Sequence, residues 1–142
     1  MEPDVEMLDY IQYNAEMKKN TLKKLMDTVD DQNFAGILAA QYDQYNDIFK
    51  KCEVKIQDSD LFIKEVSPVT KATNDLLLNI KTINDKTPAH IAEILIKENT
   101  DGIINLRKRI KENSDIPQDI LDISSSLLQT EESSVEDMKK YL

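Results

Sequence analysis

The chain has 142 residues, of which 40% are hydrophobic and 32% are charged, and its formal net charge is −9. Two glycines and four prolines are too few turn-forming residues for a many-stranded β fold, and the aliphatic content is too high for a disordered chain. The acidic balance argues against nucleic acid and anionic membrane surfaces as partners, since both need a basic face. We expect one acidic domain covering residues 1–142.

The N-terminus and the cysteine content indicate a compartment. The first four residues, Met1-Glu2-Pro3-Asp4, carry two acidic side chains and lead directly into an amphipathic pattern, without the basic and apolar segments of a signal peptide. The apolar runs are far shorter than a membrane span. A single cysteine, Cys52, cannot form an intramolecular disulfide, which suits a reducing compartment. We predict a cytoplasmic protein, with a composition typical of an AT-rich bacterial genome.

Apolar residues at helical spacing predict a first hairpin over 4–57. Its helices cover about 4–29 and about 32–57, and Asp31 is a good N-cap for the second. The core-facing residues of this hairpin are expected to be Val5, Leu8, Ile11, Ala15, Leu22, Met26 and Val29, followed by Phe34, Ile37, Leu38, Tyr45, Ile48, Phe49, Cys52 and Ile56.

A crossover over 58–86 is predicted to contain a further short helix at about 68–84. Ser67 is its expected N-cap, and Pro68 is its first residue. Thr87-Pro88 repeats this signal, and a second hairpin over 87–142 follows.

The second hairpin is predicted to consist of helices at about 88–112 and about 117–141, the latter opened by Pro117. Short turns make the helices of each hairpin antiparallel neighbours. The sequence therefore predicts an all-α, antiparallel four-helix bundle with an additional short helix in the crossover between the second and third helices of the bundle.

Four long helices with one long crossover resemble the ferritin-like superfamily over essentially the whole chain. The segment His90-Ile91-Ala92-Glu93 also resembles small uncharacterised bacterial ferritin-like proteins. The resemblance implies a carboxylate-rich metal site inside the bundle, formed by carboxylates from two helices and Glu-x-x-His pairs from the other two. This chain has only the reversed order, with His90 preceding Glu93.

Polar residues interrupt the apolar stripes near the middle of each long helix. Glu131 stands where a leucine is expected on the last helix, and Asn99 and Gln41 lie within the stripes of two others. Lys18 and Lys19 flank the stripe of the first helix. Since all five lie near helix midpoints, we predict a polar layer at the waist of the bundle.

That layer has two readings. In the first, Lys18 or Lys19 pairs with Glu131, and the amides of Gln41 and Asn99 complete a structural network that fixes helix register. In the second, facing helices form a ligand or metal pocket. The candidate metal ligands are Glu131, His90, Glu93 and Glu16, and iron, manganese or zinc are the candidate metals.

No nucleophile with a base can be assembled from this sequence. His90 is the single histidine, and Cys52 lies among apolar residues, so it is expected to be a core residue. We therefore identify no catalytic residues and expect no cofactor. The leading interpretation is a non-enzymatic structural or protein-interaction bundle, and the alternative is a ferritin-like metal-binding or redox protein.

Some apolar residues lie away from the main stripes and predict a covered surface. Two helices carry them, at Ile91, Ile94 and Ile104 and at Tyr10, Tyr13 and Met17. A helix that is apolar on several sides is either central or covered by a partner. The crossover helix accounts for one such patch, and for the other we expect a homodimer.

Overall fold

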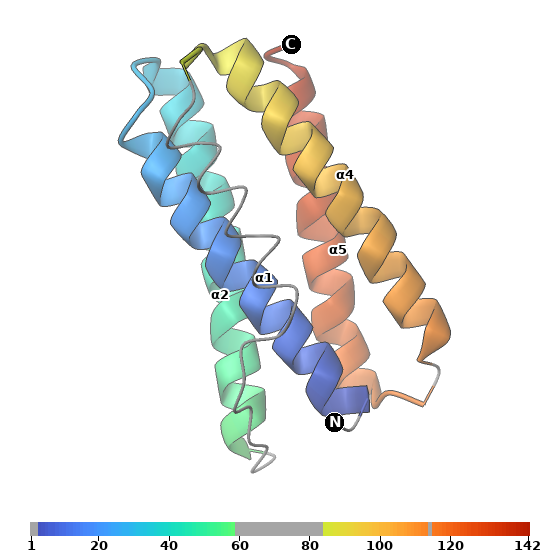
Figure 1. Ribbon diagram of the computed structural model, residues 1–142. Coiled ribbons are helices and arrows are strands. Elements are labelled where there is room, and N and C mark those ends of the chain that lie inside the picture. The colour runs from blue at the N-terminus through green and yellow to red at the C-terminus, as the bar shows by residue number, and fades with distance from the viewer. Residues whose placement is uncertain (1–2, 59–83, 114) are drawn as a thin grey trace.

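The computed structural model describes residues 3–58, 84–113 and 115–142, and these form four helices and no strands (Figure 1). The helices are α1 (Pro3–Met26), α2 (Gln32–Asp58), α4 (Pro88–Glu112) and α5 (Gln118–Lys139). The prediction of an all-α protein with four long helices is confirmed. The short helix predicted at 68–84 lies outside the described residues.

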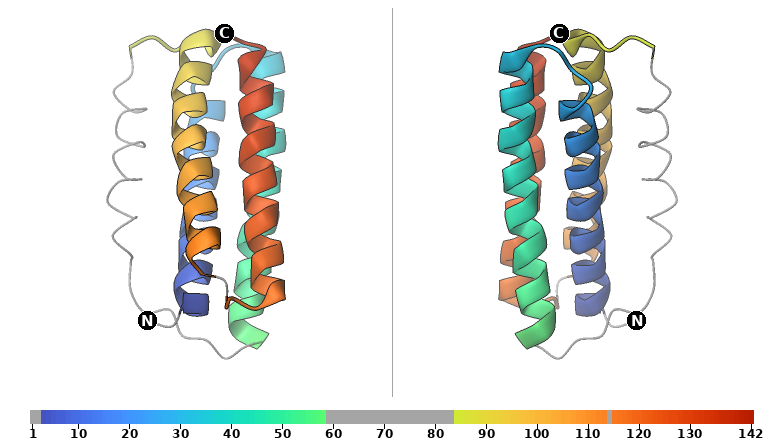
Figure 2. Two further views of the ribbon diagram at one scale, coloured as in Figure 1. Left: turned by 90° about the vertical axis from the view of Figure 1, so that its right-hand side faces the viewer. Right: turned by 90° about the vertical axis from the view of Figure 1, so that its left-hand side faces the viewer.

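The helices form two hairpins that pack side by side (Figures 1 and 2). α1 packs along α2, α4 packs along α5, and the two hairpins meet mainly through α2 and α5. α1 and α5 run in one direction, and α2 and α4 run in the other (Figure 1). α1 and α4 lie on one side of the bundle, and α2 and α5 lie on the other (Figure 2).

The caps that the sequence predicts start two of the helices. The backbone N–H of Phe34 donates to Asp31 Oδ1 over 2.9 Å, which caps α2. The backbone N–H of His90 donates to the Thr87 hydroxyl over 3.4 Å, with Pro88 as the first residue of α4. The local sequence therefore fixes the residues at which α2 and α4 begin. These starting points set the heights of the polar side chains further along the two helices.

Loss of the α2 cap should have a measurable effect on stability. We expect Asp31→Ala to lower the free energy of unfolding by about 1 kcal/mol, because an N–H of the first turn loses its acceptor. Asp30→Ala is the matched control, since Asp30 is an exposed neighbour outside this hydrogen bond. Urea denaturation would measure both. Equal stability of the two variants would show that the cap contributes nothing.

The core is continuous across both hairpins. Its fully buried side chains include Leu8, Ile11, Phe34, Leu38, Tyr45, Leu106, Ile120, Leu127 and Met138. At the end of the bundle where α2 begins, the rings of Phe34 and Tyr141 meet edge to face with centroids 4.7 Å apart. This aromatic contact ties the C-terminus to the first hairpin.

The off-stripe apolar residues divide into covered and exposed ones. Tyr10, Met17 and Ile91 are buried, whereas Ile104 is 47% exposed. Among the residues that the structure describes, no helix has the length and apolar content needed to cross a membrane.

Candidate functional site: a buried polar layer and the cleft beside it

Four of the five residues predicted for the polar layer are buried: Lys18, Gln41, Asn99 and Glu131. The fifth, Lys19, is not. Its Nζ lies 4.4 Å from the centroid of the Phe49 ring, in cation–π contact on the α2 side. Successive residues of a helix point about 100° apart, so only one lysine of the pair can face the bundle interior.

Lys18 joins the two hairpins through a hydrogen bond. Its ammonium group donates to Asn99 Oδ1, and so links the middle of α1 to the middle of α4. Burial lowers the pKa of Lys18, while the negative charges of Glu131 and Glu98 oppose this shift. Among the described residues, no ion pair within 4.0 Å joins Lys18 to Glu131. The predicted direct salt bridge is replaced by a lysine–amide hydrogen bond with the carboxyl nearby.

Glu131 is the most unusual group of the layer. Its side chain is 2% exposed, and burial raises its pKa to about 7, although the neighbouring charge of Lys18 acts in the opposite direction. Its Oε2 is buried without a hydrogen-bond partner. The carboxyl group lies against Gly102 of α4, where an added Cβ would come within 2.5 Å of Oε2. Glycine at this position therefore leaves the space that the carboxyl occupies.

The sequence did not assign Thr21, Tyr45 and Ser134 to the polar layer. Thr21, Tyr45 and Ser134 each bury a hydroxyl oxygen without a hydrogen-bond partner, as does the amide nitrogen of Gln41. Burial, and then the charge of Glu131, raises the pKa of Tyr45. The Ser134 hydroxyl lies near that of Tyr45 and favours its ionised form, without the geometry of a hydrogen bond. The layer therefore extends from Lys18 and Glu131 towards α2.

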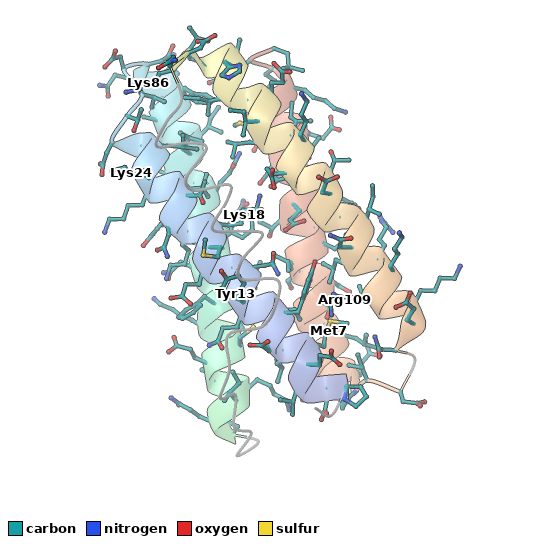
Figure 3. The ribbon with its side chains drawn as sticks, in the orientation of Figure 1. Met7, Tyr13, Lys18, Lys24, Lys86 and Arg109 are labelled. Atoms are coloured by element: carbon teal, nitrogen blue, oxygen red, sulfur yellow. The ribbon has the colours of Figure 1, made fainter. Side chains whose placement is uncertain are left out.

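A cleft of about 780 Å³ lies between α1 and α4. Lys18, Gly102 and Glu131 belong to its lining, together with polar side chains of both helices. The Arg109 guanidinium carbon lies 4.0 Å from the centroid of the Tyr10 ring, and this cation–π contact bridges α4 to α1. Figure 3 labels Arg109 on α4 and Lys18 on α1. Burial raises the pKa of Tyr10 to about 12.

The candidate metal ligands do not lie together. His90 and Glu93 are partly exposed in the first turns of α4, with His90 Nδ1 3.9 Å from Glu93 Oε2, and Glu93 also pairs with Lys97. Glu16 is exposed on α1, and Glu131 is buried halfway along α5. Within the described ranges, no three His, Cys, Asp or Glu side chains are grouped as a metal site would require. The predicted ligand set therefore does not form one centre.

Cys52 is buried in the core, as its neighbours in the sequence predict. Burial raises the pKa of its thiol to about 12, which keeps the sulfur protonated and poorly nucleophilic.

Neither family models, nor curated protein sequences, nor solved structures gave a match to this chain.

Proposed function

We propose that this chain is a non-enzymatic structural or protein-interaction bundle with a ferritin-like, antiparallel arrangement of its helices. The observation that carries this proposal is the buried hydrogen bond from Lys18 to Asn99. It joins α1 of the first hairpin to α4 of the second. Buried polar contacts of this kind can specify one register of helices, at the expense of stability.

The chemistry of the interior supports a role without catalysis. The Cys52 thiol is protonated and buried in the core, and His90 lies at the start of α4, away from the polar layer. Neither residue is placed beside Glu131. The layer is thus composed of groups that hold helices and accept hydrogen bonds, which is what a scaffold or a binding module needs.

The ferritin-like metal-binding or redox alternative requires inward carboxylates from at least three helices. Glu131 is such a carboxylate on α5, whereas Glu16 and Glu93 are exposed. We therefore rank this function second. Iron, manganese or zinc that copurifies stoichiometrically and is lost in Glu131→Ala would favour it over the scaffold.

We further propose that the scaffold is a homodimer that uses the outer face of α4, where Ile104 is 47% exposed. Light scattering should then give about twice the chain mass of 16.3 kDa. Ile104→Asp should shift the protein towards the monomer, because a carboxylate would be buried in the interface. Val54→Asp, at an exposed apolar position on α2, is the control and should remain dimeric. A mass near 16.3 kDa for the unchanged protein at high concentration would refute the dimer.

A further inference from the structure

We propose that the cleft between α1 and α4 binds a small linear diamine, with Glu131 as the inner acceptor for one ammonium group and the acidic residues of α4 as acceptors for the other. Binding in this cleft does not require the dimer contact proposed at Ile104.

The inner end of the cleft contains an unpaired hydrogen-bond acceptor, the carboxyl of Glu131. Glu131 lines the cleft and is almost fully buried, and its Oε2 has no hydrogen-bond partner among the residues that the structure describes. Buried polar atoms of folded proteins are nearly always paired, so a group in this position calls for a donor. The nearest cation does not meet the need, because the Lys18 ammonium donates to Asn99 and forms no ion pair with Glu131.

The lining of the cleft carries more negative than positive charge. Five acidic and three basic side chains line it, namely Glu6, Glu98, Asp101, Glu112 and Glu131 against Lys18, Lys108 and Arg109. Two of the three cations already have partners, since Lys18 donates to Asn99 and Arg109 stacks on Tyr10. Together with the net charge of −9, this balance favours a cationic ligand over an anionic one.

Further acceptors for a cation, Glu98 and Asp101, lie along α4 close to Gly102. Gly102 and Glu131 both line the cleft, and the lack of a side chain at Gly102 leaves room for the Glu131 carboxyl. Asp101 precedes it and is exposed, and Glu98 lies one turn earlier and is half-buried. Neither forms an ion pair with a described residue. A methylene chain that crosses Gly102 can therefore join one ammonium at Glu131 to a second at Asp101 or Glu98.

The protonation of Glu131 adds a pH dependence. Glu131 interacts electrostatically with Lys18 and Tyr10 of α1 and with Tyr45 of α2. The charged residues of α4 that line the cleft with it are Glu98, Asp101, Lys108, Arg109 and Glu112. With a pKa of about 7, Glu131 is mostly neutral at pH 6 and mostly ionised at pH 8. Because an ammonium group prefers the ionised form, affinity should rise about tenfold over this range.

Isothermal titration of the full chain with 1,4-diaminobutane at about pH 8 tests the proposal. Three matched compounds separate charge from shape: 1-aminobutane has one ammonium group, 1,4-butanediol has none, and succinate carries the opposite charge. We expect the diamine to bind at least about tenfold more tightly than the diol or succinate, since only it offers cations to the acidic lining. The monoamine should bind more weakly than the diamine.

Variants locate the two acceptors. Glu131→Gln keeps the shape of the side chain and should weaken diamine binding at least about tenfold, and it should remove the pH dependence. Asp101→Asn should weaken binding of the diamine by roughly threefold without affecting 1-aminobutane, because an exposed ion pair contributes little. Glu136→Gln, on the exposed side of α5, is the control and should bind like the unchanged protein. Far-UV circular dichroism would verify that each variant is folded.

Three results would overturn the proposal. The first is diamine binding no tighter than diol binding, which would mean that the ammonium charges contribute nothing to binding in the cleft. The second is unchanged affinity in Glu131→Gln. The third is preferential binding of succinate, which would identify the cleft as an anion site around Lys18 and Arg109.

Discussion

The free energy of unfolding should fall by about 3 kcal/mol as the pH rises from about 4.5 to about 7, and replacing Glu131 with glutamine should abolish this fall. In the unfolded chain this carboxyl loses its proton near pH 4.5, whereas in the fold it keeps the proton until about pH 7. Between these values the folded state binds more protons than the unfolded state. The contribution of Glu131 to the free energy of unfolding is therefore complete below about pH 4.5. It decreases as the pH rises and is lost above about pH 7.

Urea denaturation of both proteins across this pH range measures the effect. The difference in unfolding free energy between the unchanged protein and Glu131→Gln should change by about 3 kcal/mol, since other titrating groups contribute similarly to both. Glu132→Gln is the control, because Glu132 is an exposed neighbour that pairs with Arg107. A constant difference between the unchanged protein and Glu131→Gln would show that Glu131 has the same pKa in both states.

Removing Glu131 and Lys18 together should be far less damaging than removing Glu131 alone. Glu131→Leu leaves the buried Lys18 ammonium without the nearby carboxyl, and we expect a loss of about 3–5 kcal/mol. Lys18→Met should be less harmful, because Glu131 can remain protonated near neutral pH. Asn99 then loses its donor, which costs about 1 kcal/mol. The double variant replaces both groups with apolar side chains and should approach the stability of the unchanged protein.

A double-mutant cycle from denaturant unfolding gives the coupling between the two residues, which we expect to be about 3 kcal/mol. Asn99→Ala provides a further comparison, because it removes the acceptor of Lys18 and leaves both charges. Additive effects of the two single changes would contradict the electrostatic link. So would an unaltered Tm in Glu131→Leu.

The helices and the centre of the polar layer could be predicted because both depend on local patterns. Caps at Asp31 and Thr87 start helices where the sequence indicates. Helical spacing placed Lys18 and Glu131 near the interior, and both are buried. The same spacing could not choose between Lys18 and Lys19, since they flank the apolar stripe on either side. Contact of Lys19 with the Phe49 ring decides this, and that contact depends on how α2 packs.

The rest of the site depends on distances between helices, which a helical pattern does not contain. Tyr45 reads as an apolar core residue in the sequence, and only its position near Glu131 reveals that its hydroxyl is part of the layer. His90 and Glu93 share one face of α4, but their spacing does not predict how far along the bundle they lie from Glu131. The cleft itself lies between α1 and α4, which belong to different hairpins, so a pattern within one helix does not predict it.

The most direct test of the polar layer is a carbon-13 NMR titration of the Glu131 carboxyl carbon, assigned by comparison with Glu131→Gln. A buried carboxyl with an unpaired oxygen should titrate with a midpoint near pH 7. A midpoint near pH 4.5, the ordinary value for a glutamate, would contradict the account, because it would mean that Glu131 is hydrated or fully paired in the folded protein.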